Sequence, residues 1–333
     1  MSWNVLITAR AVSEVGEPAV ELLRCNGCVV TVSPKPGALR AEELRPLLAG
    51  IDAILASADD YSLAILSSPE AGRLKILSRW GVGYDSIDVN AATRQGIVVA
   101  YTPGLLDETV ADYAFALLLS LARGIPLADC AMRQGVWKHV WGHDVAGKTL
   151  GIVGCGRIGQ AVARRARGFN MGVLGYDVAP CLQAEQYGLK FVSLDVLLEA
   201  SDFVTLHAAL TPQSRGLIGM PQLRRMKATA CLLNTARGAL IDEAALALAL
   251  RDGWIAGAAL DTFVQEPLPA EHPFRQTPNL LLSPHQASFG YETGARVSVC
   301  AAQAILDLMQ GKQPRHVVNP EVFQCGTLRA ALR

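Results

Sequence analysis

The sequence predicts an α/β protein with two domains, each built on a parallel sheet. Short apolar segments alternate with amphipathic segments of helical length, the pattern of strands joined by crossover helices. An almost wholly apolar stretch, residues 108–122, separates two such series and indicates a long buried helix. The length of 333 residues exceeds that of a usual domain, roughly 100–200 residues, which also favours two domains.

The first series of elements precedes residue 104. Helices are expected at 18–24 and 42–48. The expected strands are the apolar segments 5–7, 29–32, 53–55, 74–77 and 97–99.

The second series follows a polar, tryptophan-bearing stretch at 132–147. Six strands are expected there, at 150–153, 173–176, 203–206, 231–234, 257–260 and 280–282. A last long helix, 291–309, can return the chain to the first domain. We therefore predict a discontinuous domain, 1–104 plus 289–333, and a second domain, 105–288.

Composition narrows the functional classes. Hydrophobic residues make up 51% of the chain, and 30 Lys and Arg balance 30 Asp and Glu. This neutral balance, without a basic cluster, argues against binding to nucleic acid or an anionic membrane surface. The amino-terminal residues lack the pattern of a signal peptide, and no apolar run reaches the roughly 20 residues of a membrane span. We expect a cytoplasmic protein.

The cysteines do not predict a metal site. Of the eight, only Cys25 and Cys28 have a metal-like spacing, and they lack a second pair or a nearby histidine. We expect a turn there and no metal.

A glycine-rich segment predicts a dinucleotide site. The strand at 150–153 runs into Gly154, Gly156 and Gly159, spaced as G-x-G-x-x-G, and then into a helix at 160–167. Glycines here allow a tight turn, close approach to a pyrophosphate and close helix packing. Asp177 follows Gly159 by eighteen residues, where its carboxylate can accept both ribose hydroxyls and repel a 2′-phosphate. We therefore expect NAD, although Arg157 could still partly accommodate NADP.

Three residues suit hydride transfer to a 2-oxo acid. Arg237, Glu266 and His285 each follow one of the last three predicted strands, where ligands of open sheets collect. Arginine can bind a carboxylate through two N–H groups, and histidine can give and take a proton near neutral pH. Glu266 can stabilise the charged histidine. Alone, each could be an ordinary surface or structural residue, but together, downstream of the glycine motif, they predict an active site. His207, which ends the strand at 203–206, is expected to line the cofactor cleft.

The ordered motifs resemble the D-2-hydroxyacid dehydrogenase family over almost the whole chain. The resemblance rests on residues 79–88, 147–154, 234–238, 242–246, 259–263 with 266–267, and 283–285. It implies a flavodoxin-like substrate domain and a Rossmann cofactor domain, with the active site in the cleft between them.

The resemblance also implies roles for individual residues. His285 would be the general acid and base, Glu266 its partner and Arg237 the ligand of the substrate carboxylate. Asp261 would lie near the nicotinamide carboxamide. The other residues implied to contact cofactor are Ile158, Thr235, Ala236 and Ser288.

Further implications concern substrate and assembly. Backbone amides of Gly81, Val82 and Gly83, beside Trp80, would bind the substrate carboxylate, and Arg79 could face a distal anionic group. Family members are commonly homodimers, and the segment 132–144, with Trp137 and Trp141, would contact the second subunit. The implied substrate residues thus lie in segment 79–83 and the implied subunit contacts in segment 132–144.

The sequence departs from the family pattern in two places. Ala208 and Ala209 stand where a proline is usual, and Ser288 lies where glycine is frequent. Both changes concern the backbone around the nicotinamide.

Two alternatives remain at this stage. The same scaffold could oxidise phosphite, formate or a phosphonate, or it could serve as an NAD-sensing module of the corepressor type. The side chain of the substrate and the physiological direction stay open.

Overall fold

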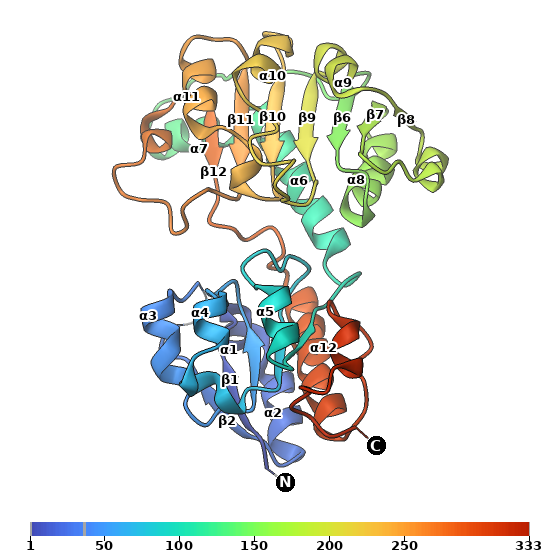
Figure 1. Ribbon diagram of the computed structural model, residues 1–333. Coiled ribbons are helices and arrows are strands. Elements are labelled where there is room, and N and C mark those ends of the chain that lie inside the picture. Colours follow the sequence, from blue (N-terminus) through green and yellow to red (C-terminus); the bar gives the residue numbers. More distant parts are fainter. Residues whose placement is uncertain (1, 36–37, 333) are drawn as a thin grey trace. The chain divides into compact units, whose positions relative to one another are not determined.

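The computed structural model describes residues 2–35 and 38–332, which form two compact units. The first comprises Met1–Leu106 and Phe289–Arg333, and the second Asp107–Ser288. Each is an α/β layer structure with helices on the faces of one sheet (Figure 1).

The first unit holds a five-stranded parallel sheet in the order β2-β1-β3-β4-β5. This is the flavodoxin-like order expected from the resemblance. Its strands are β1 (Asn4–Ile7), β2 (Val29–Val32), β3 (Ala53–Ala56), β4 (Ile76–Arg79) and β5 (Val98–Ala100). Its α-helices are α1 (Arg10–Val15), α2 (Glu17–Cys25), α3 (Ala41–Leu44), α4 (Leu63–Leu66), α5 (Val89–Arg94) and α12 (Tyr291–Met309).

The second unit holds a seven-stranded parallel sheet in the order β12-β11-β10-β9-β6-β7-β8. Its order reverses between β6 and β9, the point where doubly wound sheets bind dinucleotides. The strands are β6 (Thr149–Val153), β7 (Gly172–Tyr176), β8 (Leu189–Phe191), β9 (Phe203–Leu206), β10 (Cys231–Asn234), β11 (Gly257–Leu260) and β12 (Leu280–Leu282). Its α-helices are α6 (Asp107–Ala122), α7 (Ile125–Arg133), α8 (Arg157–Gly168), α9 (Leu194–Ala200), α10 (Met220–Arg225) and α11 (Glu243–Arg251).

Several elements differ from the sequence prediction, and no range was predicted for helices α1, α4, α5, α9, α10 and α11. The second sheet has a seventh strand, β8, an edge strand of three residues that is too short to show an alternating pattern. The helix expected at 42–48 stops at Leu44 and continues as a 3₁₀ turn, because Pro46 has no N–H to donate. The strand expected at 74–77 begins at Ile76.

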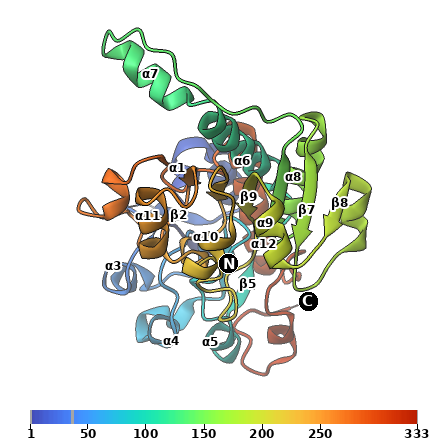
Figure 2. The same ribbon diagram turned by 90° about the horizontal axis from the view of Figure 1, so that it is seen from above.

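Helix α7 was not predicted. It begins after Gly124, whose φ of 61° is left-handed, and none of its residues is buried. Figure 2 shows α7 and the chain that follows it extending away from the sheet of the second unit.

The long helices α6 and α12 contribute to separate cores. α6 packs beside α8 and buries seven residues, among them Phe115 and Leu118. α12 packs beside α2, with Val297 and Ile305 fully buried in the core of the first unit. Across residues 2–35 and 38–332, no single helix is long and apolar enough to span a membrane, although the bent pair α6 and α7 together would meet such a test.

A buried carboxylate, Asp52, joins the amino-terminal ends of neighbouring strands in the first unit. It accepts hydrogen bonds from the backbone of Asn4 and from Arg73, each at 2.9 Å, and from Lys75. Burial acts to raise the pKa of Asp52, but these three donors outweigh it and hold the pKa below its ordinary value. The ionised carboxylate therefore stabilises the folded unit.

We expect Asp52→Asn to lower the free energy of unfolding by about 1–3 kcal/mol at neutral pH, because charge-assisted hydrogen bonds are lost. The matched change Glu14→Gln removes an exposed pair and should have little effect. Since the folded pKa of Asp52 is depressed, the difference between the native chain and Asp52→Asn should be full above about pH 4 and shrink as the pH falls further. Urea unfolding across this range measures it, and equal midpoints at pH 7 would contradict the assignment.

Candidate active site

The sheet of the second unit brings three predicted residues to one edge. β10, β11 and β12 are parallel neighbours, so their carboxyl ends lie side by side. Arg237, Glu266 and His285 all lie in the segments that leave those ends. Side chains at this edge of an open parallel sheet point toward the ligand-binding face.

Glu266 binds both its own loop and His285. Its Oε1 accepts a hydrogen bond from the Phe263 N–H at 2.9 Å, and its Oε2 lies 2.6 Å from Nδ1 of His285. Burial acts to raise the pKa of Glu266, but His285, the Phe263 N–H and the charge of Arg237 outweigh it, so the pKa lies below its ordinary value. An ionised carboxylate beside Nδ1 favours a proton on that nitrogen. The second ring nitrogen, Nε2, is then the one that can face a ligand.

The loop that carries His285 is fastened to a buried carboxylate. Asp261 accepts hydrogen bonds from the Ser283 hydroxyl at 2.6 Å and from the N–H groups of Gln286 at 3.0 Å and Ala287 at 2.8 Å. The N–H of His285 donates to the Asp261 carbonyl at 2.8 Å, and His285 has a left-handed φ of 51°. Burial outweighs the donors and raises the pKa of Asp261. The family resemblance implied that Asp261 lies near the cofactor. Its hydrogen bonds show that it also holds the loop that carries His285.

Arg237 lies in a turn held by a buried amide. Asn234 donates from Nδ2 to the Arg237 carbonyl at 2.8 Å and accepts from the Ala236 N–H at 3.0 Å. A side chain on Gly238 would meet the Phe263 carbonyl carbon at 2.0 Å, so only glycine allows this turn to lie against the loop that leads to Glu266. The sequence showed Asn234 only as part of a motif, because its partners are backbone groups of its own turn.

The predicted cofactor loop joins β6 to α8. Gly154 has a φ of 93°, and a Cβ there would lie 2.4 Å from the backbone nitrogen of Ala208. Gly156 precedes the first residue of α8, and its Cβ position is open. The loop thus presents exposed backbone at a helix amino terminus, where phosphate charge is favoured. The first turn of α8 holds the remaining predicted residues, Arg157, Ile158 and Gly159.

Asp177 closes the same loop from the end of β7. Its Oδ2 accepts a hydrogen bond from the Cys155 N–H at 2.7 Å, and its Oδ1 accepts from the Ala179 N–H at 2.9 Å. The carboxylate is therefore fixed beside the glycine loop, at the position predicted for a ribose ligand.

Three buried polar atoms at adjacent strand ends have no hydrogen-bond partner among the described residues. They are Nδ1 of His207 and the hydroxyls of Thr235 and Thr262, which follow β9, β10 and β11. The other ring nitrogen of His207 lies 2.9 Å from the Thr205 hydroxyl, and burial lowers the pKa of His207 to about 4, so the ring is neutral at physiological pH. Such atoms ordinarily have partners, and they suit a polar ligand such as nicotinamide. Thr262 was not predicted as a site residue; the predicted Ala236 and Ser288 are both half-buried.

The predicted substrate loop belongs to the first unit and follows β4. Arg79 donates from Nε to the Gly83 carbonyl at 2.9 Å and from Nη1 to the carbonyl of Trp80. The Gly81 N–H donates to the Thr102 hydroxyl at 2.9 Å. Of the three amides expected to bind the substrate carboxylate, that of Gly81 therefore already has a partner. The N–H groups of Val82 and Gly83 make no backbone hydrogen bond within residues 2–35 and 38–332.

Cysteines do not form a metal site in the described part of the chain. No group of three or more His, Cys, Asp or Glu side chains there could hold an ion. The Cys28 thiol lies 3.8 Å from the Met309 sulfur.

Comparisons with known proteins agree with this arrangement. The family described as "D-isomer specific 2-hydroxyacid dehydrogenase, NAD binding domain" matches residues 115–287. A glyoxylate reductase of Korarchaeum cryptofilum is 49% identical over 261 residues, 76% of this chain and 79% of the relative. A glyoxylate reductase of Thermofilum pendens is 40% identical over 318 residues, 93% of this chain and 94% of the relative. The crystal structure of the TT0316 protein from Thermus thermophilus is 38% identical, with a TM-score of 0.86, and the match covers 95% of this chain and 99% of that one.

The family model lies within the second unit, and the matches to the Thermofilum pendens and Thermus thermophilus proteins extend over both units. The chain belongs to the D-isomer specific 2-hydroxyacid dehydrogenase family and is a nicotinamide-dependent oxidoreductase of small 2-hydroxy and 2-oxo carboxylates.

Proposed function

We propose that this protein reduces glyoxylate, or a 2-oxo acid of similar size, with NADH. The observation that carries the proposal is the 2.6 Å contact between Glu266 and His285 at the edge of the sheet that also carries the glycine loop. The names of its relatives from Korarchaeum cryptofilum and Thermofilum pendens supply the substrate.

In this mechanism His285 is the proton donor. A reduced nicotinamide supplies the hydride when bound. The charged imidazole of His285, stabilised by Glu266 through Nδ1, gives a proton from Nε2 to the oxygen of the former carbonyl. In the oxidation direction the neutral imidazole takes that proton back.

Arg237 is the proposed ligand of the substrate carboxylate. A guanidinium can hold a carboxylate through two parallel N–H groups, which also orients the neighbouring carbonyl. The turn fixed by Asn234 sets the direction of Arg237, and its charge acts on Glu266.

The contacts of Arg79 favour a substrate without a second anionic group. Its guanidinium donates to carbonyls of its own loop and lies 3.5 Å from the carbonyl of Ala56. An arginine engaged in this way braces the loop whose Val82 and Gly83 amides we assign to the substrate carboxylate. We accordingly propose the first unit as the substrate domain.

Asp177 favours NAD over NADP. Its carboxylate is fixed by the N–H groups of Cys155 and Ala179, and the next residues, Val178, Ala179 and Pro180, offer no cation for a 2′-phosphate. Repulsion between the carboxylate and that phosphate is expected to dominate the choice.

We also propose a homodimer joined through α7 and the chain after it. Trp137 is 79% exposed and Trp141 97%, and Leu127 and Met132 of α7 are exposed as well. Aromatic side chains are enriched in the buried centres of subunit interfaces, and a second copy offers cover for this surface. A cytoplasmic location stays a prediction.

The first test is oxidation of NADH and NADPH by the purified protein with glyoxylate, hydroxypyruvate and 3-phosphohydroxypyruvate. We expect turnover of glyoxylate with NADH, and a loss of about 10²–10⁴-fold in kcat for His285→Ala with NADH affinity unchanged. Preference for the phosphorylated acid would overturn the assignment of Arg79. Tight NADH binding without turnover of any acid would indicate a cofactor-sensing module instead.

The pairing of Glu266 with His285 predicts a change in the pH profile. Reduction needs charged His285, and Glu266→Gln keeps the shape of the partner but removes its charge. We expect the alkaline fall of kcat for reduction to move to lower pH, because the charge of His285 lowers the pKa of Glu266 and the interaction is reciprocal. The matched control is Glu271→Gln, which changes an exposed acid in the same segment between β11 and β12. It should leave the pH dependence of kcat unchanged. An unshifted profile for Glu266→Gln would contradict the pairing.

The dimer proposal predicts that Trp141→Ser weakens self-association. Sedimentation velocity at micromolar concentration should show a dimer for the native chain and a growing monomer fraction for the variant. Val178→Ser removes another apolar side chain, 90% exposed, and should leave the dimer unchanged. A native chain that sediments as a monomer would refute the proposal.

A further inference from the structure

The first unit contains a cavity on the outer side of α12, with a volume of about 700 Å³. This lies within the range of roughly 300–1,000 Å³ that is usual for small-molecule sites. None of its lining residues belongs to the candidate active site.

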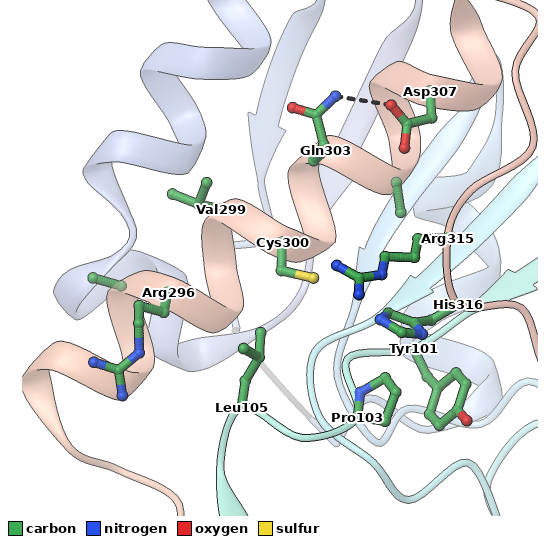
Figure 3. A pocket seen from close by; sticks show the side chains of 12 residues that line it. Tyr101, Pro103, Leu105, Arg296, Val299, Cys300, Gln303, Asp307, Arg315 and His316 are labelled. Carbon is green, nitrogen blue, oxygen red and sulfur yellow. Dashed lines mark hydrogen bonds between the residues drawn. The ribbon is translucent and has the colours of Figure 1, made fainter.

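One side of the cavity is apolar because of the period of α12. Val297 and Ala301 face the core of the first unit, whereas Ala295 and Val299, four residues apart, line the cavity. Leu105, from the segment that leads out of the first unit, also lines the cavity, and Figure 3 shows its side chain beside α12. This wall offers apolar contacts to a ligand body.

The polar side of the cavity carries an excess of positive charge. Its acid, Asp307, accepts a hydrogen bond from Gln303 at 2.8 Å. Two exposed arginines, Arg296 and Arg315, also line the cavity. Arg296 donates to the Thr293 hydroxyl at 2.9 Å, whereas Arg315 makes no hydrogen bond or ion pair within residues 2–35 and 38–332. Figure 3 shows its guanidinium extending toward the thiol of Cys300. An arginine without an ion pair, beside an apolar wall, suits a ligand with one anionic group.

Two of the segments that line the cavity are close in sequence to the boundaries of the first unit. Leu105 is two residues before Asp107, where the second unit begins, and α12 starts two residues after Phe289, where the chain returns. A ligand held here would contact Leu105 and the face of α12 that begins at Ala295.

We propose that this cavity binds a small organic carboxylate with an aliphatic or aromatic body, its carboxylate on Arg315 and its body against Val299 and Leu105. The proposal is independent of the assigned 2-oxo acid, because the ligand needs no reactive carbonyl.

Cys300 provides a local readout. Its thiol lies in the cavity, and alkylation by N-ethylmaleimide at about pH 8.5 can be followed by peptide mass spectrometry. The exposed Cys25, in the same unit, serves as the internal control. The probe is 4-phenylbutyrate, which is neither a 2-oxo nor a 2-hydroxy acid, with 4-phenylbutan-1-ol as its uncharged counterpart.

We expect 4-phenylbutyrate to slow alkylation of Cys300 saturably and to leave Cys25 unchanged. Arg315→Gln should raise the half-protecting concentration by roughly tenfold, the effect of losing one charge-assisted contact. Arg94→Gln, an exposed arginine on α5, should leave it unchanged, and the alcohol should protect far less.

Three outcomes would overturn the proposal. They are no protection by the probe, equal protection in Arg315→Gln, and protection that depends on protein concentration without the probe. The last would assign the cavity to a second copy of the chain.

Discussion

Parallel pairing of β10, β11 and β12 is the constraint on which the candidate site depends. Parallel strands that pair in register end together, so residues that are 19 to 48 positions apart in the chain leave the sheet at one edge. The shared edge brings Arg237, Glu266 and His285 near one another, and local turns, among them the left-handed backbone of His285, complete the approach. A break in this pairing would separate His285 from Glu266, even if both side chains kept their preferred conformations.

The shared sheet edge places Arg237, Glu266 and His285 only approximately. Hydrogen bonds from buried polar groups then fix the loops that carry His285 and Arg237. Asp261 accepts three hydrogen bonds from the segment around His285, and Asn234 holds the turn of Arg237. These donors offset only part of the cost of burying the Asp261 carboxylate, and its pKa is therefore raised. The left-handed backbone of His285 is tolerated because the same contacts determine the path of the loop.

The sequence was sufficient for the fold class and for the positions of the candidate residues, because strand ends and glycine spacing are local signals. Strands β2, β9, β10 and β12 and helix α12 have the predicted bounds. The contacts that support the site could not be predicted, since Asp261 and Ser283 are 22 positions apart and nothing local pairs them. Helix α7 could not be predicted because none of its residues is buried. Strand β8 could not be predicted because three residues are too few to show an alternating apolar pattern.

The return of α12 to the first unit fixes an order of assembly during protein synthesis. Residues 107–288 form a complete unit, which can fold as soon as they leave the ribosome. The first unit is made earlier, yet Val297, Ala301 and Ile305 of α12 belong to its core. The amino-terminal sheet must therefore wait, with an open apolar face, until a later part of the chain is translated. The unit that is synthesised first is completed last.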